Sequence, residues 1–200
     1  MGRKKNYDRV KLIEEAMEIF RDHGFAGTSS QMLVDRLGVN RFSLYAEFGN
    51  KQGLFDAALE HYNNVVVERN FGPLDSPEAG IEEIQKLLEF FASASKGPVS
   101  GRGCLLCNTA VEFGSTDPNG SAFVQKYFKR ISKAFYKALS NSKNKALLRD
   151  NVSLKKEADF FTATTLGLFV MIRAKAPAKV IDNAAKMAIE HLKRLCDDKD

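Results

Sequence analysis

Long apolar runs are missing from this chain of 200 residues. No stretch approaches the roughly 18 to 20 apolar residues that a membrane-spanning helix needs, and the N-terminus lacks the apolar segment of a secretory signal. The opening Met-Gly also fails as a myristoylation motif, because Asn6 stands where that motif needs Ser or Thr. We therefore expect a protein that works in the cytoplasm and has no membrane partner.

Cysteine is scarce as well, with three residues in the whole chain. An odd number this small argues against a disulfide scaffold and for reduced thiols. Cys104 and Cys107 form one Cys-x-x-Cys pair, but no second pair and no nearby histidine completes a set of zinc ligands. The sequence therefore predicts neither a metal site nor a cofactor.

Strand-like alternation and internal repeats are also absent, whereas apolar residues recur at helical spacing along most of the chain. The first such segment runs from Asp8 to His23, and Gly24 provides a stop. Thr28 precedes Gln31 by three positions, the pattern of a capping box at the start of a second helix. The sequence therefore predicts an all-α fold. Helices are expected over residues 8–23, 28–37, 40–48, from 51 onward, 77–94, 103–114, 119–141, 154–174 and 177–196.

The composition, 44% apolar and 28% charged residues, is that of a globular protein that folds on its own. The formal charge of +5 fits an acidic partner without requiring one. The clearest cluster of like charge is Arg3, Lys4 and Lys5 at the N-terminus, which is either a solvated end or an arm that contacts phosphates. After Arg69, a concentration of Gly and Pro predicts a linker or a sharp turn between two units.

The second and third predicted helices are both short and are separated by Gly38. Two short helices joined by a tight turn are typical of the helix-turn-helix, whose second helix lies in the major groove of DNA. Leu44 and Phe48, one turn apart, are expected to face the core. The alternative is an ordinary helical hairpin in which Tyr45 and Phe48 are core aromatics and Arg41 is solvated.

The outward side of the recognition helix would carry the groups that contact DNA. Arg41 can donate two hydrogen bonds to guanine, and Ser43 can bond to a base or a phosphate. The ring of Phe42 suits contact with a thymine methyl group. Tyr45 and Lys51 are donors suited to the phosphates that flank the groove, Lys51 at the N-terminus of the next helix.

Polar side chains at the helix starts have two explanations. Thr28 and Ser30 are accounted for by helix capping, or they contact phosphates, and Asn40 can cap the recognition helix. The predicted DNA-contacting residues are Lys4, Lys5, Thr28, Ser30, Asn40, Arg41, Phe42, Ser43, Tyr45 and Lys51.

The first quarter of the chain resembles the N-terminal signature of the tetracycline-repressor (TetR) family of transcriptional regulators. Phe42 departs from the commoner small residue at its position, which bears on base preference and not on DNA binding. The residues that carry the resemblance are Ala16, Phe20, Gly24, Thr28, Ser29, Leu37, Gly38, Val39, Leu44, Tyr45, Phe48, Lys51 and Leu54.

This resemblance implies a non-enzymatic regulator, most often a repressor, that binds double-stranded DNA. It divides the chain into a helix-turn-helix DNA-binding domain at residues 1–50 and a helical ligand-binding and dimerisation domain at residues 51–200. A two-fold dimer would place two recognition helices about 34 Å apart, so a roughly palindromic operator is expected.

Cys104 is predicted in the first turn of its helix, where the helix dipole and neighbouring Arg102 would favour thiolate over thiol. Cys107 follows one turn later on roughly the same face. The alternative is that both are small core residues, because free cysteine is among the most buried residue types. A thiol enzyme acting through the two cysteines is a weaker alternative, since the sequence lacks a β-α-β pattern and a nearby histidine base.

The Gly103-Cys104-Leu105 opening of that helix resembles TetR-like regulators that respond to electrophiles or oxidants through cysteine. Lys175 resembles a lysine that those members place close to the cysteine. The other possibility is a reversible small-molecule inducer, held in a pocket by Phe91, Phe113 and Tyr127. These aromatics are equally well explained as core.

The last two predicted helices carry apolar stripes with small residues, which allow helices to approach closely. As the resemblance implies, two such helices from each subunit would form the interface of a homodimer. The alternative is that the stripes are buried inside one subunit. The stripe residues are Ala163, Gly167, Met171, Val180, Ala184, Ala188, Leu192 and Leu195.

Overall fold

The computed structural model describes the backbone of residues 7–97, 100–113 and 118–196. Within these ranges the chain is helical, and the one β-type pairing is an isolated bridge between Leu148 and Cys196. The predicted all-α fold is confirmed. The helices are α1 (Arg9–His23), α2 (Ser30–Leu37), α3 (Arg41–Phe48), α4 (Lys51–Tyr62), α5 (Glu68–Phe71), α6 (Ile81–Ser93), α7 (Leu105–Phe113), α8 (Pro118–Asn144), α9 (Leu154–Arg173) and α10 (Ala178–Arg194).

Local capping explains where the N-terminal helices begin and end. The side chains of Asp8, Asn40 and Asn50 accept hydrogen bonds from main-chain N–H groups two or three residues ahead, at 2.8, 2.8 and 2.9 Å. Gly24 and Gly38, with φ of 73° and 64°, end α1 and α2 in a region of backbone space that other residues rarely adopt. These boundaries agree with the prediction.

The predicted capping box at Thr28 is wrong. Ser29 caps α2 instead, its hydroxyl accepting a hydrogen bond from the N–H of Met32 at 3.1 Å. Thr28 is fully buried, and its hydroxyl donates to the carbonyl of Gly24 at 2.6 Å. The chain leaving α1 turns Thr28 inward. Its hydroxyl is bound to a main-chain carbonyl inside the α1–α2 turn and cannot reach a phosphate.

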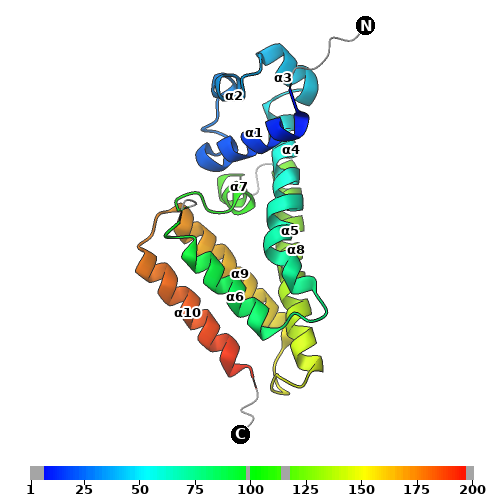
Figure 1. Ribbon diagram of the computed structural model, residues 1–200, viewed down its shortest axis with the longest axis vertical. Coiled ribbons are helices and arrows are strands. Elements are labelled where there is room, and N and C mark those ends of the chain that lie inside the picture. Colours follow the sequence, from blue (N-terminus) through cyan, green and yellow to red (C-terminus); the bar gives the residue numbers. More distant parts are fainter. Residues whose placement is uncertain (1–6, 98–99, 114–117, 197–200) are drawn as a thin grey trace.

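Two units follow one another along the long axis of the molecule (Figure 1). Helices α1, α2 and α3 gather at one end, and α4 packs against α1 and leads away from them. At the other end α8 and α9 pack together, α6 and α10 lie beside α9, and α7 lies between this group and α1. The described helices include none that is both long and apolar enough to cross a membrane.

The passage from α4 into the second unit is irregular. Directly after Tyr62 the backbone forms a π-helical turn, Asn63–Val67, which leads into α5. A 3-10 turn, Gly72–Asp75, then redirects the chain at the stretch where Gly and Pro predict a sharp turn. This π-helical turn was not predicted from the sequence; its residues, two Asn followed by three β-branched Val, are weak helix formers but do not specify a π-helix.

Phe113 and Phe91 belong to different aromatic clusters of the core. Phe113 packs at 5.3 and 5.8 Å, between ring centroids, from Phe25 and Phe55, where α7 meets the N-terminal helices. Phe91 packs at 4.7 Å from Phe169 in the second unit. The grouping of Phe91 and Phe113 around one pocket is therefore not seen, and both belong to packed aromatic clusters.

The predicted dimer stripes are partly used inside the subunit. Ala188, Leu192 and Leu195 are buried because α10 packs against α6 and α9 of the same chain. Three of the predicted stripe residues, Ala163, Gly167 and Val180, do remain exposed, and the larger side chains of Phe160, Val170 and Met187 are exposed beside them.

Candidate nucleic-acid interface and its connection to the C-terminal helices

Helix α3 lies on the surface with one side anchored and the other free. Leu44 is fully buried, and this contact sets the rotation of the helix. Arg41 is exposed, Ser43 is half-buried, and the ring of Phe42 is 85% exposed. The structure therefore turns the predicted base-contacting residues outward, at the N-terminal end of α3 where a recognition helix meets base edges.

Tyr45 joins the two helices of the helix-turn-helix. Its phenol and the hydroxyl of Ser30 are 2.6 Å apart, with Tyr45 as donor, and its ring lies 5.8 Å from the guanidinium carbon of Arg41. Tyr45 is half-buried and packs against the core on its other side. Ser30 is the first residue of α2, so both side chains lie where unpaired main-chain N–H groups favour an anion.

Lys51 has an internal role that sequence reasoning missed. Its ammonium donates to the carbonyls of Phe25 and Thr28, both at 3.0 Å, and lies 4.1 Å from the centroid of the Phe25 ring. It thus ties the α1–α2 turn to the start of α4. One of its three N–H donors remains for a phosphate.

The N-terminal segment is attached to α3 through Glu47. One carboxylate oxygen accepts a hydrogen bond from the phenol of Tyr7 at 3.1 Å, and the other accepts from Nε of Arg9 at 3.0 Å. Lys4 and Lys5 lie outside the described residues. The hydrogen bond to Glu47 places Tyr7, two residues before α1, beside the recognition helix.

A polar junction connects the helix-turn-helix unit to the C-terminal helices. Arg173, at the end of α9, donates to the carbonyls of Arg21 and Asp22 at the end of α1, at 2.9 and 3.1 Å. Arg21 in turn donates to the carbonyl of Gly103 at 2.7 Å. Arg173 thereby satisfies two C-terminal carbonyls of α1 and places a positive charge at the negative end of the helix dipole.

Glu112, near the end of α7, completes this junction. Its two carboxylate oxygens accept hydrogen bonds from the N–H groups of Phe25 and Ala26, at 3.0 and 2.7 Å. The turn that leads into α2 therefore rests on a side chain of the second unit. A shift of α7 would move this turn, and with it the helix-turn-helix.

The two thiols of the Cys-x-x-Cys pair are both buried. Cys104 precedes α7, is 3% exposed, and has its sulfur 3.1 Å from the phenol oxygen of Tyr127. The phenol of Tyr62, in α4, also lies near Cys104, and this proximity contributes to raising the pKa of Tyr62. Cys107 is 4% exposed and donates to the carbonyl of Leu166 at 3.8 Å. The first thiol therefore lies between α4 and α8, and the second joins α7 to α9.

Burial dominates the ionisation of this cluster. It raises the pKa of the Cys107 thiol to about 12, with a smaller contribution from Cys104. Burial and the nearby Cys104 also raise the pKa values of Tyr62 and Tyr127 well above the ordinary phenol value. These three groups are therefore neutral at pH 7, as expected of core residues.

The cations expected to act on Cys104 are placed elsewhere. Arg102 forms ion pairs with Glu18 and Asp22 of α1, so its charge is shared between two carboxylates instead of facing the thiol. The stem of Lys175 lies against Gly101, in the loop that leads to Cys104, where a Cβ atom on this glycine would be 2.5 Å from Lys175 Cε. Lys175 is exposed, with a φ of 53°.

Comparison with known proteins matches both units of the chain to one family. Residues 12–58 match the profile of bacterial regulatory proteins of the tetR family, and residues 80–188 match the tetracyclin repressor-like C-terminal domain. The uncharacterised regulator YezE of Bacillus subtilis is 29% identical over 88% of this chain and 91% of its own. The transcriptional repressor ComR of Escherichia coli is 34% identical over 54% of this chain and 51% of its own.

A solved structure is similar along nearly the whole fold. A cysteine-substituted variant of the TetR-family regulator CifR, determined with a 26-base-pair operator DNA, superposes with a TM-score of 0.75 at 22% identity, covering 94% of this chain and 98% of that one. This similarity shows a shared fold, and the two profile matches show that the chain belongs to the tetR family of bacterial transcriptional regulators, which bind DNA and are not enzymes.

Proposed function

We propose that this protein is a cytoplasmic repressor that binds a roughly palindromic operator as a homodimer and leaves it when an inducer acts on its C-terminal domain. Residues 1–50 are the DNA-binding domain and residues 51–200 the regulatory and dimerisation domain. The observation that carries the proposal is the exposed Arg41, Phe42 and Ser43 on a helix anchored by buried Leu44. ComR, which is a repressor, supports the sign of regulation.

The decisive experiment is selection of bound sequences from random double-stranded DNA by the full chain. A palindromic consensus with two half-sites one helical turn apart, or a multiple of this, is the expected result. Enrichment of no sequence, despite salt-dependent binding, would contradict a specific operator.

The exposed apolar side chains of α9 and α10 support the homodimer. Phe160 and Val170 of α9 are 41% and 44% exposed, and Met187 of α10 is 57% exposed. Ala163 and Gly167 lie between the first two along α9 and leave room for a close helix approach. A second copy of the same face would cover these side chains.

Thymine recognition by Phe42 is tested by removing one methyl group. Replacing the contacted thymine by uracil should weaken binding about fourfold, since one buried methyl contributes about 0.8 kcal/mol. Titrations with a series of operators, each with uracil at one thymine position, locate the contact. In Phe42→Ala, thymine and uracil operators should bind alike. A uracil effect of the same size in this variant would assign the methyl contact to another residue.

Two modes of induction are compatible with the regulatory domain. Burial of both thiols supports a reversible ligand, because thiols without solvent access react slowly. The position of Cys104 between Tyr62 and Tyr127 supports covalent sensing, because an adduct would separate α4 from α8. An adduct needs to favour the DNA-free conformation by only about 1.4 kcal/mol to weaken operator binding tenfold.

Titration with N-ethylmaleimide separates these modes. The Cys104 sulfur would add to the double bond of the maleimide, and its proton would pass to the adjacent carbon through solvent. If Cys104 is the sensor, operator binding falls about tenfold in the parent and is retained in Cys104→Ser. Equal release of the operator by the parent and by Cys104→Ser would assign sensing to Cys107 or Cys196. If both proteins stay bound to the operator, induction by a reversible ligand is the remaining mode.

A further inference from the structure

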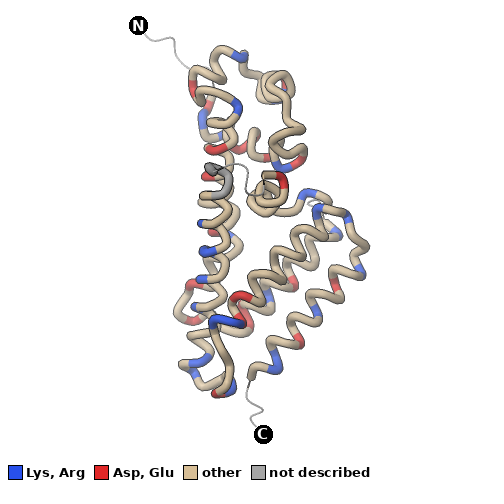
Figure 2. Tube along the Cα trace, turned by 180° about the vertical axis from the view of Figure 1, so that it is seen from behind, with Lys and Arg blue, Asp and Glu red and all other residues tan. Residues whose placement is uncertain are grey.

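Helix α8 holds much of the positive charge of this protein. It contains no Asp or Glu, whereas the formal charge of the whole chain is +5. Figure 2 shows Lys and Arg positions along this helix. Its basic residues are Lys126, Lys129, Arg130, Lys133, Lys137 and Lys143.

Two of these cations are already paired and four are not. Arg130 binds Glu68 and Asp75, and Lys143 binds Asp150. Among the described residues, the other four lysines have no carboxylate within ion-pair distance, and all are exposed. Their spacing of three or four residues places like charges on one side of a helix, which is unfavourable until an anion binds.

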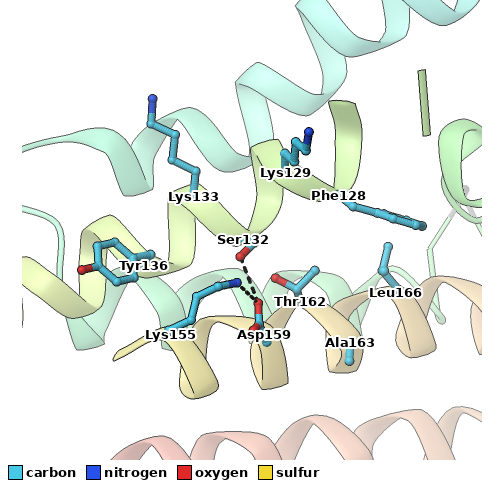
Figure 3. Close-up of a pocket in the computed structure, with 10 residues that line it drawn as sticks. All are labelled: Phe128, Lys129, Ser132, Lys133, Tyr136, Lys155, Asp159, Thr162, Ala163 and Leu166. Atoms are coloured by element: carbon cyan, nitrogen blue, oxygen red, sulfur yellow. Dashed lines mark hydrogen bonds and ion pairs between the residues drawn. The ribbon is translucent and has the colours of Figure 1, made fainter. Parts of the chain in front are cut away.

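An open groove lies beside this row of lysines, between α8 and α9 (Figure 3). Its volume is about 540 Å³, within the range of small-molecule sites. Phe128 points toward Leu166 at one end, and Tyr136, 44% exposed, lies at the other. Ala163, which also lies on the proposed dimer face of α9, adds to the apolar lining, so the groove offers two separated aromatic rings and an aliphatic wall beside that face.

The charged part of the lining is predominantly positive. Lys129 and Lys133 stand on the α8 rim, and Lys155 approaches from α9. The one acid in the lining, Asp159, accepts hydrogen bonds from Lys155 at 2.6 Å and from Ser132 at 3.2 Å. Lys155 therefore offsets Asp159, and the two rim lysines remain available to an incoming anion.

We propose that the α8–α9 groove binds a small amphipathic carboxylate, with its apolar chain or ring on Phe128, Ala163 and Leu166 and its carboxylate at Lys129 and Lys133. In Figure 3 both lysines point away from α9, and their flexible four-carbon stems allow them to turn toward a ligand in the groove. The size of the groove favours a small molecule over a polyanion, which would engage all four exposed lysines. This site goes beyond operator binding and does not involve the thiols.

Decanoate is a suitable probe, and calorimetry of the full chain measures its Kd. The double variant Lys129→Gln/Lys133→Gln should bind decanoate about tenfold more weakly than the parent. Lys126→Gln/Lys137→Gln is the matched control, because it removes the same charge from the same helix outside the groove lining. This control should bind like the parent, and decanol, which lacks the carboxylate, should bind the parent more weakly.

Three results would overturn the proposal. Equal weakening in the two double variants would indicate a diffuse charge effect. Equal affinity for decanoate and decanol would leave an apolar surface without anion recognition. No binding to the parent, together with a sedimentation-defined dimer that dissociates in Lys129→Gln/Lys133→Gln, would assign the groove to a second copy of the chain. Melting curves followed by circular dichroism verify that both variants are folded.

Discussion

Arg41→Ala is expected to weaken binding to the selected operator by about 1 to 3 kcal/mol, a factor of about 5 to 150, and to leave the fold intact. The side chain is exposed and its one described contact is with the ring of Tyr45, so its removal costs the free protein little. In the complex, the same change would leave a guanine without its bidentate partner. Fluorescence anisotropy with operator and with random DNA measures both effects.

Arg36→Ala is the matched control for this prediction. Arg36 is exposed in the last turn of α2, carries the same charge, and lies outside α3. Its loss should affect operator and random DNA alike or affect neither. An unchanged operator affinity in Arg41→Ala, or an equal loss on random DNA, would remove Arg41 from base recognition and place it among the phosphate contacts.

Lys51→Ala is expected to lower both stability and DNA affinity. The loss of an ammonium that hydrogen-bonds to two carbonyls should cost about 1.5 to 3 kcal/mol of unfolding free energy, because those oxygens lose a charged partner. For a chain of this length that corresponds to a fall in Tm of about 3 to 12 °C. Binding to all DNA sequences should weaken about equally.

The salt dependence of binding separates the two roles of Lys51. If its third N–H contacts a phosphate, the slope of log Kd against log salt becomes shallower by about one unit in Lys51→Ala. Lys51→Arg keeps the charge, and Lys11→Ala removes an exposed lysine of α1 as a control for charge alone. A normal slope with a lowered Tm would confine Lys51 to its internal role, and a normal Tm would contradict the carbonyl contacts.

The helix boundaries were predictable because they depend on neighbours within a few residues. Asp8, Asn40 and Asn50 cap helices wherever a short polar side chain precedes a helical pattern, and Gly24 stops α1 for reasons of backbone freedom alone. The same local reasoning failed at Thr28. Adjacent hydroxyl residues compete for one cap there, and packing against α1 decides which of them turns inward.

The junction between the two units had no signal in the sequence. Arg173 and Glu112 bind main-chain carbonyls and N–H groups, and these groups are the same in every residue. When a side chain binds the main chain, the residue type of its partner carries no information, so the sequence does not indicate the pairing. The Tyr45–Ser30 contact was missed for a related reason, because two hydroxyl groups show no charge complementarity.

By itself the sequence determined that the chain is helical, where its DNA-binding unit lies, and that Leu44 faces inward while Arg41 and Phe42 face outward. Periodicity and capping are local, so a linear pattern is enough to predict them. Only the tertiary structure decided which of the candidate groups are available for function. Arg41 remains exposed, Lys51 donates to two carbonyls, and Cys104 is buried beside the phenol of Tyr127. These outcomes depend on contacts between distant segments, such as Arg173 and Arg21, which are 152 positions apart and are joined by folding alone.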